Sequence, residues 1–219
     1  MLELPPGETN HVHNVLRGRN GDLLEVVDGK GMLFTATLRG WGEAAVAEEL
    51  AAPAGAGVEI SLYQAVPKGG RMDLVVEKAT EVGATRIVPL LAERGVVNPR
   101  GGKIGRWRRV AEAASRQSLR LGVPEVTEPV RFEDAVLEAV ETGVLLHNAP
   151  DLEPVEDVVR PPANLLVGPE GGWSKDGLLL AEEAGIAFGG LGPYRLRSET
   201  AGIVAVARTL AALESKVER

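Results

Sequence analysis

The sequence predicts an α/β protein in which a small β domain, residues 1–55, precedes an α/β domain, residues 56–219. β-rich runs joined by turn residues fill the first part, and the small-residue stretch AAPAGAG (51–57) follows as a plausible linker. Strands then alternate with amphipathic helices. Such alternation predicts a parallel sheet that is covered by helices on both faces.

The first domain is predicted to contain a β-hairpin. Two apolar, β-rich runs within residues 22–38 are separated by Asp28-Gly29-Lys30-Gly31, and Asp-Gly between such runs is a strong hairpin signal. Residues 43–50 (EAAVAEEL) are compatible with a strand or a helix. His11 and His13 alternate as strand neighbours would, and they lack the further ligands that a metal site needs.

The second domain is predicted to alternate five strands with five helices. In its first helix the apolar residues recur at helical spacing, and Gly83 is a natural stop. The long helix that follows is predicted to end at Gly122. The predicted strands span residues 58–66, 85–93, 143–149, 164–168 and 186–192, and the predicted helices span 70–83, 103–122, 131–141, 174–185 and 198–215.

Composition excludes several classes of protein. The chain has no cysteine and three histidines, which excludes disulfides and thiolate metal sites and makes us expect no metal. It contains no run of 18 apolar residues that could span a membrane. The N-terminus lacks the basic start and apolar run of a signal peptide, so we expect a cytoplasmic protein without a membrane partner.

Positive charge is concentrated in the middle of an acidic chain. The net charge is −7, yet residues 67–120 hold twelve Lys or Arg against five Asp or Glu. This block indicates either solvated helix faces or a groove for a polyanion. Trp107 lies among its arginines and is more often a core residue than a stacking surface for an unpaired base. The candidate nucleic-acid contacts are Arg17, Lys68, Arg71, Lys78, Arg94, Arg106, Arg108, Arg109, Gln117 and Arg120.

Three loops follow predicted strands and are rich in glycine or proline: residues 147–150, 168–172 and 189–193. The carboxyl ends of parallel strands meet at one edge of a sheet, where ligands bind. Glycine permits positive φ and a close approach of a ligand to the backbone. Taken singly the loops could be tight turns, but together they favour a cofactor pocket. Neither G-x-G-x-x-G after the first strand of this domain nor a phosphate-binding G-x-x-x-x-G-K-[ST] is present, which argues against NAD and ATP.

The segment LGPYRLRSETAGIVA (191–205) leads from a glycine-rich loop into the last helix. Ser198 is a natural N-cap for this helix, and Glu199 favours its first turn. Arg195 and Arg197 precede the helix on a loop that we expect to be exposed. Capping explains Ser198, but it does not explain two arginines beside a glycine-rich edge.

These motifs together resemble the ribosomal RNA small-subunit methyltransferase E family, uridine N3-methyltransferases of the SPOUT superfamily. The resemblance is carried by HNVLRGRNGD (13–22), KGGRMDLVVEKATEVGATRIVPL (68–90), EAASRQSLRLGVPEV (112–126), LLVGPEGGWS (165–174) and LGPYRLRSETA (191–201). It covers nearly the whole chain. Tyr194-Arg195 stands where the family pattern has Arg-Ile, and Arg116 stands where it has Glu.

The resemblance implies a PUA-like β-barrel over residues 1–55 that binds RNA, and a SPOUT domain over 56–219 with a C-terminal trefoil knot. It implies S-adenosylmethionine as methyl donor, a homodimer, and small-subunit (16S) ribosomal RNA as substrate, free or in the assembled 30S subunit. The cofactor-binding residues that it implies are Leu146, His147, Gly168, Pro169, Glu170, Gly171, Gly172, Leu191, Gly192 and Leu196.

N3 of uridine carries a proton and is a poor nucleophile until that proton leaves. A cation beside a uracil carbonyl would stabilise the anion as it forms, and we assign this role to Arg197. Glu199, the second catalytic candidate, or Glu170 could accept the proton or orient the base. Two rival hypotheses are a non-catalytic RNA-binding protein that retains the fold, and an unrelated nucleotide-dependent α/β enzyme, which the missing phosphate motifs disfavour.

Overall fold

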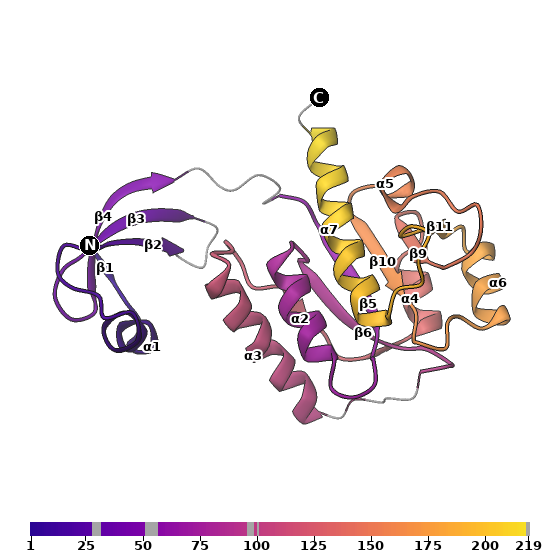
Figure 1. The fold of residues 1–219 in the computed structure, drawn as a ribbon, viewed down its shortest axis with the longest axis horizontal. Coiled ribbons are helices and arrows are strands. Elements are labelled where there is room, and N and C mark those ends of the chain that lie inside the picture. The colour runs from indigo at the N-terminus through magenta and orange to yellow at the C-terminus, as the bar shows by residue number, and fades with distance from the viewer. Residues whose placement is uncertain (28–31, 51–56, 96–98, 100, 218–219) are drawn as a thin grey trace. The chain divides into compact units, whose positions relative to one another are not determined.

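The computed structural model describes residues 1–27, 32–50, 57–95, 99 and 101–217 (Figure 1). The chain divides into two compact units. The first unit comprises Met1–Pro53 with Leu119–Gly122, and the second comprises Ala54–Ser118 with Val123–Arg219. Each unit is described separately below.

The first unit is built on a four-stranded antiparallel sheet of β1 (Leu2–Glu3), β2 (Leu23–Val27), β3 (Leu33–Leu38) and β4 (Glu43–Leu50), in the order β1-β4-β3-β2. The predicted hairpin is confirmed, since β2 and β3 pair antiparallel, and its turn at 28–31 lies outside the described residues. Residues 43–50 form a strand because they pair with β3 along its length. Among the described strands β1 and β2 are the edges of an open sheet.

The expectation that His11 and His13 lie on a strand is wrong. A short helix, α1 (Pro6–Asn10), continues as π-helix through His11–Val15. Pro6 occupies the first helical turn, where its missing N–H is tolerated, and the Asn14 side chain donates to that of Asn10 at 2.5 Å. Thr9 and Val12 bury one side of the segment, which a two-residue period could not do.

The second unit contains a seven-stranded sheet in which every pairing is parallel, and this confirms the predicted α/β architecture. The main order is β11-β9-β10-β5-β6-β7, and β8 also pairs with β6. From β5 the chain forms one side of the sheet with β6, β7 and β8. It then forms the other side with β9, β10 and β11, and β10 lies beside β5. Its strands are β5 (Ile60–Ala65), β6 (Arg86–Leu91), β7 (Glu125–Val126), β8 (Val130–Arg131), β9 (Gly143–Leu146), β10 (Ala163–Val167) and β11 (Ala187–Gly189).

Helices cover both faces of this sheet (Figure 1). Helices α2 (Met72–Glu81), α3 (Gly101–Gln117), α5 (Val155–Val158) and α7 (Ser198–Val217) contribute to one core, and α4 (Phe132–Glu138) and α6 (Lys175–Glu183) to a second. Successive strand residues alternate between the two, so that Leu62 and Leu165 enter the first core while Tyr63 and Leu166 enter the second. Trp107 is buried in the first core, so the structure favours the interpretation as a core residue over that as a stacking surface.

Several predicted boundaries shift in the structure. The helix expected to reach Gly122 ends at Gln117, because Leu119 has a φ of 52° and the helix cannot continue through it. The strands expected to reach residues 149 and 192 end at Leu146 and Gly189, where the loops begin. Gly83 ends α2 as predicted: its φ is 114°, and a Cβ there would lie 2.7 Å from a methyl carbon of Leu210.

Candidate functional site

The loops that follow β9, β10 and β11 line one cavity at the carboxyl edge of the sheet. These strands, with β5, are neighbours in the sheet, which brings the loops together although they are separated in sequence. Nine of the ten residues predicted to bind a cofactor line the cavity: Leu146, His147, Gly168, Pro169, Glu170, Gly172, Leu191, Gly192 and Leu196. The tenth, Gly171, is exposed, and its carbonyl oxygen accepts a hydrogen bond from Arg94 at 3.3 Å.

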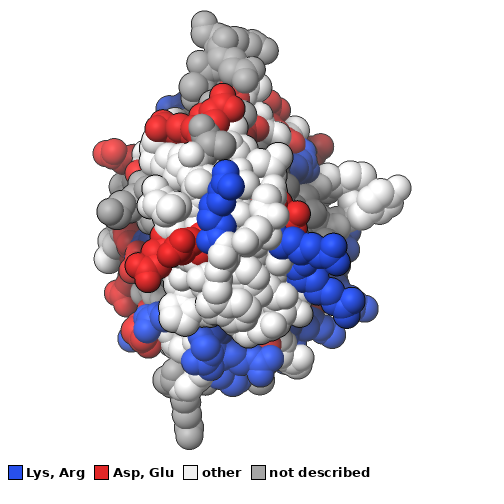
Figure 2. Space-filling view, turned by 90° about the vertical axis from the view of Figure 1, so that its left-hand side faces the viewer, with Lys and Arg blue, Asp and Glu red and all other residues white. Residues whose placement is uncertain are grey.

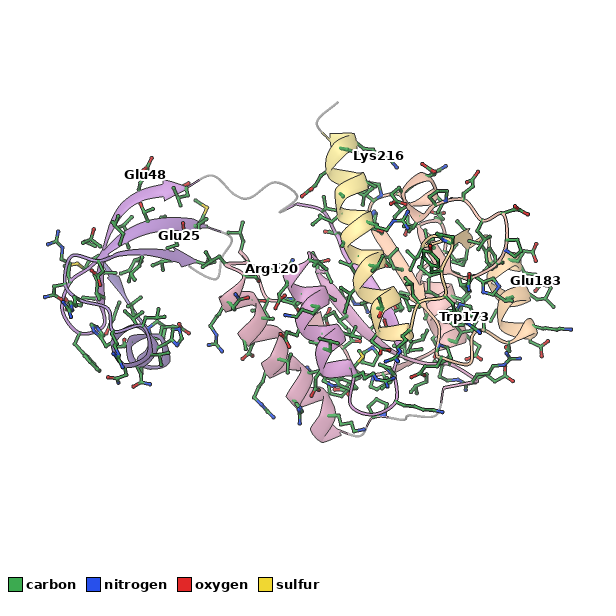
Figure 3. The ribbon with its side chains drawn as sticks, in the orientation of Figure 1. Glu25, Glu48, Arg120, Trp173, Glu183 and Lys216 are labelled. Carbon is green, nitrogen blue, oxygen red and sulfur yellow. The ribbon has the colours of Figure 1, made fainter. Side chains whose placement is uncertain are left out.

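Trp173 closes one side of this cavity (labelled in Figure 3). Its indole N–H donates to the carbonyl oxygen of Leu146 at 3.0 Å, and its ring packs against Phe132 with 4.8 Å between centroids. A Cβ at Gly168 would lie 2.9 Å from the indole ring, so only glycine allows this packing. Trp173 was not among the cofactor-binding residues predicted from the sequence, although its position directly after a glycine-rich loop could have indicated it.

Ser198 does not act as the predicted N-cap. It is the first residue of α7, and its hydroxyl donates to the carbonyl oxygen of Gly168 at 2.7 Å. The Ser198 hydroxyl oxygen in turn accepts a hydrogen bond from the side-chain amide nitrogen of Gln64 at 2.9 Å. A buried chain of hydrogen bonds therefore joins β5, the start of α7 and the loop after β10.

Gln64 is fully buried in β5 and was missed by the sequence reading. Its amide nitrogen also donates to the carbonyl oxygen of Ala65 at 3.0 Å, while its side-chain oxygen has no hydrogen-bond partner. A Cβ at Gly202 would overlap that oxygen, so α7 reaches β5 only because residue 202 is glycine. A glutamine inside a strand buried on both faces was the signal that could have identified it.

An ion pair lies beside the loop after β10. Glu199 is 6% exposed, and its carboxylate lies 3.4 Å from the Nε of Arg71, which precedes α2. The second oxygen of Glu199 is buried without a partner. Arg71 also approaches the carboxylate of Glu170 at 3.8 Å, and the backbone N–H of Lys68 donates to Glu170 at 3.2 Å. Arg71 thus links a buried carboxylate to one that lines the cavity.

The structure separates the two arginines of the segment 191–197. Both are exposed, as expected, but Arg195 lines the cavity with Tyr194 and Leu196, whereas Arg197 is absent from its lining. Arg197 directly follows Leu196 and precedes Ser198, and both of these neighbours line the cavity. It is therefore a solvent-facing cation at the margin of the cavity.

Lys78, Arg106 and Arg108, predicted as nucleic-acid contacts, are paired with groups of the protein that do not line the cavity. The ammonium of Lys78 lies 2.8 Å from both Glu77 and Glu81, and hydrogen bonds to these two carboxylates raise the pKa of Lys78. Arg106 lies 2.5 Å from Asp73, which also accepts from the indole of Trp107. Arg108 donates to the carbonyl oxygen of Val126 at 2.9 Å and pairs with Glu128 at 3.2 Å.

The other predicted contacts fall into two groups. Lys68, Arg71 and Arg94 are exposed and each contacts the loop 168–172. Arg109 and Gln117 are exposed on α3, Arg17 is exposed in the first unit, and Arg120 is grouped with that unit. The structure therefore brings the side chains of Arg71 and Arg94 and the backbone of Lys68 to the cavity loop, and it distributes the remaining residues elsewhere.

Within the described residues no group of three or more His, Cys, Asp or Glu side chains could hold a metal ion. None of the helices in that part of the chain combines the length and apolarity that crossing a membrane requires.

The cavity and its parallel sheet belong to an RNA methyltransferase. The family model described as "RNA methyltransferase domain" matches residues 55–210, which include every strand and helix of the second unit up to most of α7.

More specifically, the chain belongs to the ribosomal RNA small subunit methyltransferase E family. It is 34% identical to the family member of Synechocystis over 98% of this chain and 74% of that protein, and 34% identical to that of Mycobacterium bovis over 90% and 80%. A crystal structure of the Neisseria gonorrhoeae family member bound to S-adenosylmethionine is 32% identical, has a TM-score of 0.80, and is matched over 96% of this chain and 91% of the other.

Proposed function

We propose that the protein methylates N3 of a specific uridine in small-subunit ribosomal RNA, with S-adenosylmethionine as methyl donor. Family membership and the cofactor bound to the Neisseria gonorrhoeae relative support this. The observation that carries the proposal is that one loop, residues 168–172, both lines the cavity and contacts the guanidinium groups of the exposed Arg71 and Arg94. A cofactor and a polyanion would then meet at the same loop.

The cavity fits this cofactor. Leu146, Leu191 and Leu196 provide apolar surface for an adenine ring, and the adjoining glycine-rich loops leave backbone groups accessible to its edge. Arg195 adds a positive charge to the lining, which matches the carboxylate of the methionine moiety. When bound, S-adenosylmethionine supplies a methyl group on a positively charged sulfur.

The two arginines are then proposed to have different roles. Arg195 lies in the cavity lining, where its guanidinium would hold the cofactor carboxylate. Arg197 faces solvent at the margin, where an entering uracil would present a carbonyl oxygen. A guanidinium beside that oxygen stabilises the charge that develops as N3 loses its proton. We therefore retain Arg197 as the catalytic cation.

The two glutamates are also proposed to differ. Glu170 is exposed and lines the cavity, so its carboxylate is accessible to the N3 proton. Glu199 is buried and paired with Arg71, so it is suited to hold Arg71 in place beside Glu170. Glu199 would then contribute to catalysis through Arg71, as a positioning residue.

The remaining features that the family resemblance implies belong to the same proposal. They are a PUA-like barrel over residues 1–55 that binds RNA, a C-terminal trefoil knot in a SPOUT domain, a homodimer, and action in the cytoplasm on free RNA or the assembled 30S subunit. Family membership supports all of them.

The proposal is tested with purified protein, isotopically labelled S-adenosylmethionine, and small-subunit ribosomal RNA supplied either free or in assembled subunits. Digestion to nucleosides followed by mass analysis should show labelled N3-methyluridine. A different labelled nucleoside would overturn the N3 assignment. Saturable RNA binding without calorimetrically detectable cofactor binding would instead establish the non-catalytic RNA-binding protein as the better description.

A further inference from the structure

An exposed tryptophan lies stacked on a histidine in the first unit. The rings of Trp41 and His13 are 4.5 Å apart between centroids, with an interplanar angle of 15°. Trp41 is 67% exposed, whereas the two other tryptophans of the chain, Trp107 and Trp173, are 3% and 7% exposed. One face of the Trp41 indole is thus supported by His13, and the ring remains largely open to solvent.

The turn that contains Trp41 is fixed by two flanking glycines and by hydrogen bonds from neighbouring segments. Gly40 and Gly42 flank the tryptophan with φ values of 72° and 80°, which ordinary residues rarely adopt. The N–H of Gly40 donates to the side-chain oxygen of Asn20 at 2.7 Å, and the carbonyl oxygen of Gly42 accepts from the N–H of Leu4 at 2.7 Å. These hydrogen bonds restrict the conformation of the turn before any ligand binds. The entropy cost of binding a ligand to the Trp41 indole is therefore lower.

Three arginines belong to the same end of the first unit. Arg39 is in the turn with Trp41, and Arg17 and Arg19 are in the segment that Asn20 ties to Gly40. All three are exposed, and none forms a side-chain ion pair or hydrogen bond within the described residues. Figure 2 faces the side of Figure 1 that carries the labels α1 and β1, and it shows an uncharged surface bordered by basic side chains mainly on the right and below and by acidic ones mainly on the left and above.

We propose that Trp41, supported by His13, stacks on an unpaired base of the RNA substrate, while Arg17, Arg19 and Arg39 contact the flanking phosphates. Every base has a π-face, so a flat exposed indole binds single strands with little sequence preference, and guanidinium groups that have no partner among the described residues suit phosphates. The inference rests on the proposed function, since it assumes an RNA substrate, and it assigns a binding element of the first unit to that substrate.

The main alternative occupant is a protein, because Val15 and Leu16, which follow His13 in the chain, are apolar and also 62% exposed. The three arginines, which form no ion pair with the described residues, favour the polyanion. The whole protein is therefore titrated with a fluorescent single-stranded oligouridine and with a duplex RNA of equal length. The variants are Trp41→Ala, Trp41→Phe and Arg39→Gln, with Val46→Ala as the matched control, since Val46 is an exposed apolar residue on β4 of the same unit.

Trp41→Ala should weaken binding of the single strand about 5- to 150-fold, because stacking contributes about 1–3 kcal/mol per base. It should leave the salt dependence unchanged, whereas Arg39→Gln should lower the salt slope by about 0.7, the value for one phosphate contact on a single strand. Trp41→Phe should retain most of the affinity. Val46→Ala should match the wild type, and the affinity for S-adenosylmethionine should be unchanged in every variant.

Wild-type affinity in folded Trp41→Ala would overturn the stacking site, as would an equal loss in Val46→Ala. Loss of a protein complex or of self-association, with RNA affinity intact, would overturn it in favour of a protein contact. The proposed function fails separately: a wild-type protein that methylates no ribosomal uridine, yet binds oligouridine through Trp41, would retain this site and lose the enzymatic assignment.

Discussion

The hydroxyl of Ser198 lies 2.7 Å from the carbonyl oxygen of Gly168, although 30 residues separate them in sequence. Ser198 begins α7 and Gly168 is the first residue after β10, so this one contact attaches the last helix to the loop that lines the cavity. Gln64 completes it from β5. The Gly168 carbonyl is thereby held by Ser198 of α7, which Gln64 of β5 holds in turn.

We expect Ser198→Ala to weaken both stability and cofactor binding. Removing the hydroxyl leaves the Gly168 carbonyl without this donor and deprives the Gln64 amide of one acceptor, which costs about 1–3 kcal/mol for buried groups. Chemical denaturation and calorimetric titration with S-adenosylmethionine measure the two effects. Ser198→Thr keeps the hydroxyl and should retain most of both, so equal losses in the two variants would refute the hydrogen-bond explanation.

Gly168→Ala should reduce cofactor affinity at least tenfold, because the new Cβ would lie 2.9 Å from the Trp173 indole and displace it from the cavity wall. Gly171→Ala in the same loop is the matched control. Its Cβ would meet only the Arg94 side chain and backbone, at 3.5 Å or more, so affinity should be unchanged. Calorimetry on both folded variants measures their affinities for S-adenosylmethionine. Similar affinities in the two variants would exclude Gly168 from the binding site.

The roles proposed for the two arginines predict different kinetic defects. Arg197→Ala should lower the single-turnover methylation rate about 100- to 1,000-fold at saturating RNA and cofactor, the usual cost of losing one electrostatic donor. Arg195→Ala should mainly raise the dissociation constant for S-adenosylmethionine and retain most of the rate at saturation. If the defects are exchanged, the cavity-lining arginine is the catalytic cation and Arg197 serves binding.

The ion pair between Glu156 of α5 and Arg208 of α7 should make stability depend on pH. Burial raises the pKa of Glu156, but hydrogen bonds from Arg208, one of them 2.6 Å long, outweigh it and hold the pKa below its usual value. A depressed folded-state pKa stabilises the protein above the unfolded value of about 4.3, and this stability is lost as pH falls through the folded value.

Glu156→Gln should therefore destabilise the protein by about 1 kcal/mol at neutral pH, since the pair is partly exposed, with the difference from wild type shrinking in acid. Urea unfolding at a series of pH values measures it. Glu153→Gln, an exposed neighbour with no ion pair in the described residues, serves as control. A difference that stays constant with pH would mean that the Glu156 charge does not contribute.

The alternation of strands and helices could be read from the sequence because each element carries its own pattern. Residues 70–83 show a helical apolar face that ends at Gly83, and the apolar strands show burial on both faces. Parallel strands place their carboxyl ends at one edge, so the glycine-rich loops after β9, β10 and β11 could be assigned to one cavity from the sequence alone. The family resemblance came from the same motifs.

Three side-chain interactions depend on the tertiary structure and could not be predicted from local sequence patterns. A serine before a helix resembles an N-cap, and only the approach of β5 and Gly168 shows that Ser198 binds elsewhere. Arg106 and Arg108 look free in sequence, but packing places carboxylates of Asp73 and Glu128 beside them. The stack of His13 on Trp41 joins a helical segment to a distant turn. Each depends on residues far apart in the chain, whose proximity arises only when the sheets and helices pack.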